Sequence, residues 1–103
     1  MPTLTGAQRR FLRGRANTLK PCVQIGKNGL SAEVMAAVDA ALTDHELIKV
    51  RFLELKEERK ELAADIARQT QSELAGIIGH VAILFRQNTL PEQRKLTLPV
   101  TPE

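Results

Sequence analysis

The sequence predicts one compact α/β domain, in which helices pack on a mixed four-stranded sheet. Predicted helices and strands follow the order α-β-α-β-α-β-β, and strands that alternate with helices pair in parallel through right-handed crossovers. The last two strands are separated by two residues, so they add an antiparallel hairpin to the sheet. With 103 residues, 43% of them hydrophobic and 26% charged, the chain is long enough for a single core.

The first predicted element is a helix from about Gly6 to Arg15. Thr5 and Gln8 have the spacing of a capping box at its start. Its apolar side is thin and consists of Leu4, Ala7, Phe11 and Leu12. Three arginines share one sector of the helix surface, because they lie one, three and four positions apart: Arg9, Arg10 and Arg13. We expect them to be surface charges whose removal leaves the core intact.

A glycine turn follows the first predicted strand. The apolar run from Cys22 to Ile25 is typical of a short strand, and Gly26-Lys27-Asn28-Gly29 interrupts it. Ser31 is a suitable N-cap for a second helix that we expect to end at about Thr43. Strand, turn and helix start would direct backbone N–H groups and the positive end of a helix dipole at one place, which suits a phosphate. Gly-x-x-Gly also occurs in ordinary turns, so shaping the turn alone is the other interpretation.

The middle and the end of the chain complete the fold. Residues 47–53 alternate as a half-buried strand, with Lys49 and Arg51 on the side opposite its apolar residues. A charged helix is expected from Lys56 to about Thr70, and then a hairpin of residues 74–78 and 81–85, in which Gly79 suits a type II′ turn. Prolines interrupt the pattern after Gln87. We therefore expect a domain over residues 1–90 and a partly ordered tail over residues 91–103, in which two leucines could lie on the body of the domain.

Charge is distributed unevenly along the chain. The formal net charge is only +3, but residues 1–30 contain six Lys and Arg and no acidic residue, whereas residues 31–65 contain nine of the twelve acids. This asymmetry favours a basic face beside the glycine turn. A basic helix surface that is merely solvated is the alternative.

Several classes of function lack the residues that they need. His45, His80 and Cys22 do not form a convergent set, so we predict neither an enzyme nor a metal site, cofactor or small-molecule substrate. We expect Cys22 to be buried and inert, and a single cysteine fits a reducing, cytoplasmic location. No apolar run has the length of a membrane span. The chain has no Trp or Tyr, so a stacking platform is not expected, and recognition of an RNA backbone, as in the KH domain, is what remains.

Four segments form a distinctive series: Leu12-Arg13-Gly14, Leu19-Lys20-Pro21, Ile25-Gly26-Lys27-Asn28-Gly29-Leu30 and His45-Glu46-Leu47-Ile48-Lys49-Val50. Ile78-Gly79 and Leu84-Phe85-Arg86 continue the series. Together these segments resemble the CRM domain family, named for chloroplast RNA splicing and ribosome maturation, and its stand-alone bacterial YhbY-like members. The resemblance covers nearly all of residues 4–86. It implies an RNA-binding module with a fold similar to the C-terminal domain of translation initiation factor three. It also implies association with ribosomal RNA in precursors of the large ribosomal subunit.

The same resemblance implies which residues contact RNA. The family's RNA-contacting loop corresponds to Gly26, Lys27, Asn28 and Gly29. The flanking basic surface would comprise Arg9, Arg10 and Arg13, with Lys20 and Lys49 as weaker candidates. Arg15 departs from the family pattern, because stand-alone members often carry an apolar residue there. We therefore expect a monomeric, non-enzymatic RNA-binding protein. The alternative is a basic protein-interaction adaptor without direct RNA contact.

Overall fold

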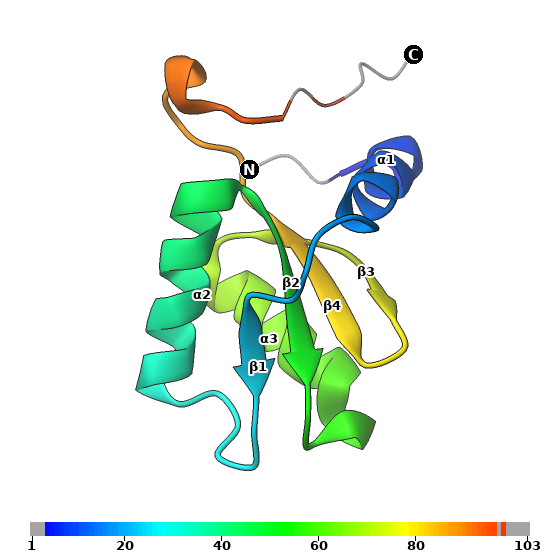
Figure 1. Cartoon of the computed structure of the whole chain (residues 1–103), viewed down its shortest axis with the longest axis vertical. Coiled ribbons are helices and arrows are strands. Elements are labelled where there is room, and N and C mark those ends of the chain that lie inside the picture. Colours follow the sequence, from blue (N-terminus) through cyan, green and yellow to red (C-terminus); the bar gives the residue numbers. More distant parts are fainter. Residues whose placement is uncertain (1–3, 97, 99–103) are drawn as a thin grey trace.

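The computed structural model describes residues 4–96 and residue 98, and its elements follow the predicted order (Figure 1). The strands form one sheet in the order β1-β2-β4-β3, in which β1 and β2 are parallel and β4 is antiparallel to both of its neighbours. This confirms the predicted mixed four-stranded sheet. The elements are α1 (Gly6–Ala16), β1 (Val23–Ile25), α2 (Ala32–His45), β2 (Leu47–Phe52), the 3-10 turn η1 (Lys56–Glu58), α3 (Arg59–Thr70), β3 (Glu73–Ile78), β4 (Val81–Phe85) and the 3-10 turn η2 (Pro91–Gln93).

The two faces of the sheet are covered by different helices, so the core is divided in two. Helices α2 and α3 cover one face, and α1 lies on the other (Figure 1). Successive side chains of β2 and β4 point to opposite faces of the sheet, as in any β-strand, so each strand contributes residues to both parts of the core. The first cluster contains Ile25, Val38, Leu42, Ile48, Val50, Phe52, Ile66 and Leu84 among others. The second is smaller and comprises Leu4, Leu12, Ala16, Leu47, Ala75, Ile83 and Phe85.

Helix α1 begins as expected but packs differently from the prediction. The capping box between Thr5 and Gln8 is present. Ala7, expected on the apolar side, is exposed, and Ala16 is fully buried in its place. Leu4, Leu12 and Ala16 belong to the second core cluster and Ala7 does not, so the last turn of α1 contributes the small buried residue that the first turn was expected to supply.

A β-bulge in β3 lies where this strand contacts α1. The register between β3 and β4 shifts between Leu74 and Gly76, so Ala75 and Gly76 together oppose Ile83. Both residues then lie on the α1 side of the sheet. A Cβ added to Gly76 would lie 2.7 Å from Cδ of Arg13. Glycine at this position therefore gives the Arg13 side chain room to cross the strand.

The turn from α2 into β2 consists of one buried residue, Glu46. Helix α2 ends at His45, two residues later than predicted, and Glu46 takes φ +63°. The Glu46 side chain is completely buried, and its carboxylate accepts hydrogen bonds from the backbone N–H groups of Asn88, Lys95 and Leu96. Three donors satisfy the charge of a group that would otherwise be costly to bury.

The expected tail is thus attached to the domain where it is described. Besides the bonds to Glu46, Leu96 and Leu98 pack against the second core cluster, as the sequence suggested they could. The prediction of partial order also concerns residue 97 and residues 99–103, which lie outside the described residues.

Candidate nucleic-acid interface

The glycine turn lies at one end of the molecule, between β1 and α2 (Figure 1). The N–H of Gly29 donates to the carbonyl oxygen of Gly26 at 3.0 Å, so Lys27 and Asn28 are the two central residues of a tight turn. Both central side chains are exposed. Within the described chain, their backbone N–H groups have no hydrogen-bond acceptor. The turn therefore presents two free donors and one positive charge to solvent.

The two glycines of the turn are glycine for different reasons. Gly29 has φ +66°, and a Cβ there would lie 3.4 Å from Cδ1 of Leu55, so its backbone conformation favours glycine. Gly26 has no such φ, and a Cβ added to it would meet no atom within 4 Å. Nothing within the described fold demands glycine at position 26. The space beside it is open to a ligand.

The start of α2 lies next to the turn and has the expected cap. Ser31 is the N-cap, and its Oγ accepts a hydrogen bond of 3.2 Å from the N–H of Val34. The positive end of the helix dipole therefore faces the same side as the turn, which favours an anion. Glu33 in the first helical turn is exposed and opposes this effect with a negative charge.

The arginines of α1 lie at the other end of the sheet. Helix α1 packs over Leu47 and Phe85, whereas the glycine turn follows Ile25, which pairs with Phe52. Leu47 and Phe52 are the first and last residues of β2. Five steps along a strand correspond to about 17 Å. The structure therefore does not bring the arginines of α1 together with the turn.

Two of these three arginines also bond within the chain. Arg9 Nη1 donates to the carbonyl oxygen of Leu4 at 2.8 Å, and Arg13 Nη1 donates to that of Ala75 at 3.0 Å. Both side chains are half-buried, although all three arginines were expected to be surface charges. Arg10 is exposed and has no partner among the described residues. It is the member of the trio that is free to bind a ligand.

Lys49 and Arg51 extend from β2 on the same face as α1, in the interval between the helix and the turn. Lys49 is half-buried, and its Nζ donates to the carbonyl oxygen of Leu19 at 3.1 Å. Arg51 is exposed and pairs in register with Gln24, one residue before Ile25. Arg51 was not among the predicted contacts, although its alternation with Lys49 places both on one face. Together with the exposed Lys20, these residues join the two basic ends.

The described residues do not meet the requirements of a metal site, a membrane-spanning helix or a buried cysteine. No group of three His, Cys, Asp or Glu side chains there could hold a metal ion. No described helix is both long and apolar enough to cross a membrane. Cys22 is exposed, contrary to the prediction, because it precedes β1 and alternates with the buried Val23 onto the α1 side of the sheet, where α1 does not cover it. Desolvation still raises the pKa of its thiol, although hydrogen bonds with the backbone of Cys22 and Lys49 oppose the rise.

Two residues within the resembling segments have structural roles. Glu46 holds the residues that follow β4, as described above. Arg86 joins three elements: its guanidinium donates to the carboxylate of Asp39 at 2.7 Å, to the hydroxyl of Thr43 at 2.9 Å and to the carbonyl oxygen of Thr70 at 2.9 Å. These contacts span the ends of α2, α3 and β4 and lie away from the turn.

Comparisons with known proteins agree with the resemblance. The family model of the CRS1 / YhbY (CRM) domain matches residues 4–86. A Haemophilus influenzae protein named "RNA-binding protein" is 40% identical over 100 residues, which cover 96% of this chain and 98% of the relative. "Probable RNA-binding protein YqeI" of Bacillus subtilis is 34% identical over 97 residues, covering 93% and 99%.

A solved structure shows the same fold. The solution structure of SAV1595 from Staphylococcus aureus has a TM-score of 0.81 and 36% sequence identity, and the match covers 94% of this chain and all of that one. The sequence motifs, the fold and the relatives thus lead to one assignment. The chain belongs to the CRS1 / YhbY (CRM) domain family.

Proposed function

We propose that this chain is a non-enzymatic RNA-binding protein that acts as a monomer in the cytoplasm on precursors of the large ribosomal subunit. It contacts ribosomal RNA through the backbone of residues 26–29 and through the cations on the α1 side of the sheet. One observation carries the proposal: the turn presents two N–H groups that bond to no described residue, beside a glycine whose surroundings are open in the described structure. The relatives named as RNA-binding proteins support the choice of ligand.

The arrangement suits the sugar-phosphate backbone better than the base edges. Two N–H donors, the Lys27 ammonium and the start of α2 can surround one phosphate. Arg51, Lys20 and Lys49 continue the positive surface away from the turn, along the direction of β2. The chain has no Trp or Tyr that would stack with bases. Binding by the isolated protein should therefore depend on charge and show little sequence preference.

A salt titration tests the binding mode. If about four cations contact phosphates of a single-stranded RNA, the logarithm of the affinity falls with the logarithm of the salt concentration at a slope of about −3. An affinity independent of salt contradicts phosphate contact. It would favour the adaptor function, in which apolar residues of a protein partner supply the binding energy.

A second experiment tests the ribosomal assignment. A lysate that contains the protein is sedimented on a sucrose gradient, and fractions are probed for the protein and for large-subunit precursor RNA. Co-migration with these precursors is expected, and it should be lost in high salt before the particles themselves fall apart. Sedimentation only as free protein at low salt contradicts association with such particles.

A further inference from the structure

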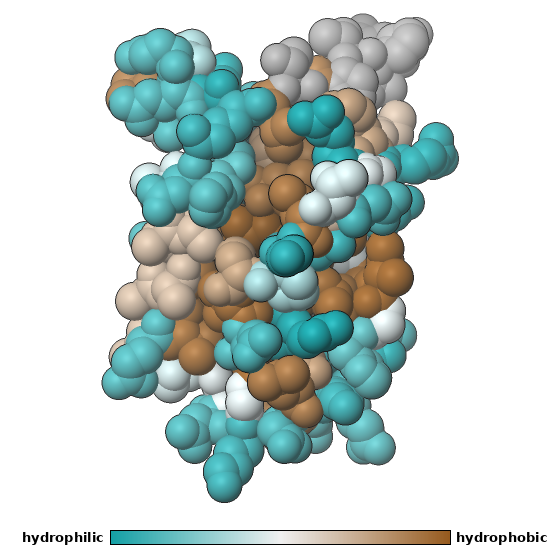
Figure 2. Space-filling model, in the orientation of Figure 1, coloured by the Kyte–Doolittle hydropathy of each residue, from teal (hydrophilic) through white to brown (hydrophobic). Residues whose placement is uncertain are grey.

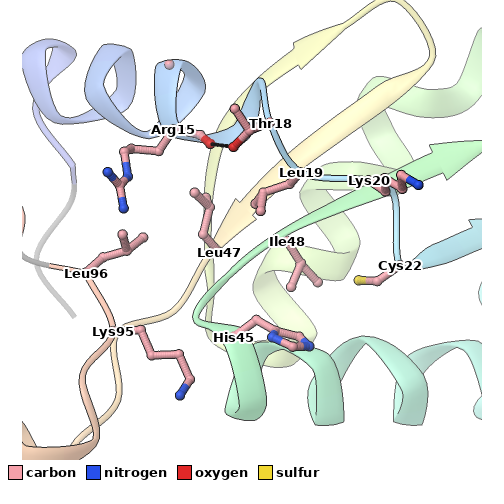
Figure 3. A pocket seen from close by; sticks show the side chains of 11 residues that line it. Arg15, Thr18, Leu19, Lys20, Cys22, His45, Leu47, Ile48, Lys95 and Leu96 are labelled. Atoms are coloured by element: carbon pink, nitrogen blue, oxygen red, sulfur yellow. Dashed lines mark hydrogen bonds between the residues drawn. The ribbon is translucent and has the colours of Figure 1, made fainter.

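A cavity of about 670 Å³ lies away from the glycine turn, on the α1 side of the sheet (Figure 3). Its walls come from the end of α1, the linker to β1, the start of β2 and the residues after η2. Its volume is within the range of sites that hold small ligands. Figure 2 shows hydrophobic surface between α1 and α2, bordered by hydrophilic side chains.

The lining combines an apolar floor with a cationic rim. Leu47 and Leu96 contribute apolar surface, and Arg15, Lys20 and Lys95 contribute three positive charges. Arg15 and Leu96 point toward each other across the opening (Figure 3). No Asp or Glu lines the cavity within the described chain. The three charged groups have no hydrogen-bond or ion-pair partner in that part of the chain, so they are available to an anion.

The walls are held by bonds that do not involve these cations. Lys49 bonds to the carbonyl oxygen of Leu19 and so fixes the linker on one side. Glu46 binds the backbone of Lys95 and Leu96 and so fixes the opposite side. The cavity is therefore formed before any ligand enters, which reduces the ordering cost of binding.

Two helices end at this cavity, and their dipoles oppose an anion. Gly14 and Arg15 of the last turn of α1 and His45 at the end of α2 all line it. Each helix end contributes about half a negative elementary charge. Two such ends amount to about one negative charge, against three full positive charges at the rim. The balance still favours an anion.

We propose that this cavity is a nucleotide subsite, in which one unstacked nucleotide of the bound RNA places its base on the leucine floor and its phosphate at Arg15 and Lys95. A nucleotide combines a flat apolar surface with an adjacent phosphate charge, as the lining requires. Unstacked bases are what proteins bind in single-stranded RNA. The proposal rests on the proposed RNA-binding function and adds a second contact, distant from the glycine turn.

Cys22 reports directly on occupancy, because it lines this cavity and is the single cysteine of the chain. The rate of its alkylation by iodoacetamide is measured at pH 8 for the free protein, with a single-stranded RNA 12-mer at saturation, and with a mixture of nucleoside 5′-monophosphates. We expect at least roughly fivefold protection by the RNA and little by the free nucleotides. Saturating RNA that leaves the rate unchanged overturns the subsite. Equal protection by free nucleotides overturns its assignment to RNA.

A second experiment compares RNA binding by two double variants. Arg15→Ala with Lys95→Ala removes two rim charges, and Lys60→Ala with Arg68→Ala removes two exposed charges of α3, on the opposite face of the sheet. The first pair should weaken RNA binding at least about fivefold more than the second and should abolish protection of Cys22. Equal loss in both pairs overturns the subsite. If the parent protein itself binds no RNA, the proposed function fails first, and the two failures remain distinguishable.

Discussion

The glycine turn and helix α1 are both basic regions, but their charged groups are in different states. Lys27 is exposed and bonds to no described residue, and the backbone around it is open. In α1, Arg9 and Arg13 already donate to carbonyl oxygens of the chain. A positive charge with an internal acceptor stabilises the fold, and a ligand must displace or share that acceptor to use it. The number of cations in a segment therefore says little about how many can bind RNA.

The largest effect should come from a carboxylate placed in the turn. Gly26→Asp introduces a negative charge where the phosphate would lie, and no atom within 4 Å of the new Cβ obstructs it. RNA affinity should fall at least about 100-fold, or about 2.7 kcal/mol. Fluorescence anisotropy with labelled RNA measures the loss, and circular dichroism checks the fold.

Gly6→Asp is the control for that substitution. It adds the same charge at the start of α1, where a Cβ also meets no atom of the described residues within 4 Å. We expect less than about a threefold change in affinity, or about 0.65 kcal/mol. If both variants lose affinity equally, the turn has no special role and the net charge alone determines binding.

The next effect should appear in stability. Arg13→Ala removes the bond to the carbonyl oxygen of Ala75 and uncovers Gly76, so the free energy of unfolding should fall by about 1.5 kcal/mol. That corresponds to a decrease of roughly 6–12 °C in the melting temperature for a domain of this size. Arg10→Ala, an exposed arginine of the same helix, should change stability by less than about 0.5 kcal/mol. An unchanged melting temperature for Arg13→Ala would mean that its bond to β3 contributes nothing to the fold.

A smaller loss of affinity is expected when the side chains of the turn are removed. Lys27→Ala with Asn28→Ala keeps both glycines and both N–H donors. The fold should hold within about 0.5 kcal/mol per site, because both side chains are exposed. Affinity should fall about tenfold, or about 1.4 kcal/mol, with a less negative salt slope. Binding equal to that of the parent would leave the turn as a purely structural feature.

The smallest effect concerns the acid beside the turn. Glu33→Gln removes the exposed negative charge in the first turn of α2 while keeping its shape. A helix N-terminus and a phosphate then interact without this opposing charge, so RNA affinity should rise about twofold, or about 0.4 kcal/mol, at low salt. The gain should disappear in high salt, because the charges are exposed to solvent. Weaker binding would show that Glu33 itself contacts the ligand.

Local patterns were sufficient for most of the fold. The capping residues Thr5 and Ser31, the alternation in β2 and the short turn at Gly79 each depend on residues close in sequence, and the structure has all of them. They determine where elements begin and end and how the strands pair. The order of elements and the mixed sheet follow from that information.

Interactions between distant residues could not be predicted in the same way. Arg13 and its acceptor Ala75 are separated by 62 positions, and Glu46 and its donor Lys95 by 49. Periodicity places an arginine on a helix surface, but it does not indicate which face of the sheet that helix will cover. The exposed Cys22 was missed for the same reason, because its environment depends on how far α1 reaches.

The division of the core into two clusters has a consequence for the order of events during synthesis. Leu12 of α1 packs with Ile83 and Phe85, which the ribosome adds roughly seventy residues later. At about 5–20 residues per second, that interval lasts on the order of 4–14 s. During this time α1 lacks its partners in β4, while β1, α2 and β2 are already available to one another. Docking of α1 on β4 must therefore wait for the hairpin, and Arg13 has no access to its acceptor Ala75 in the nascent chain until that hairpin emerges.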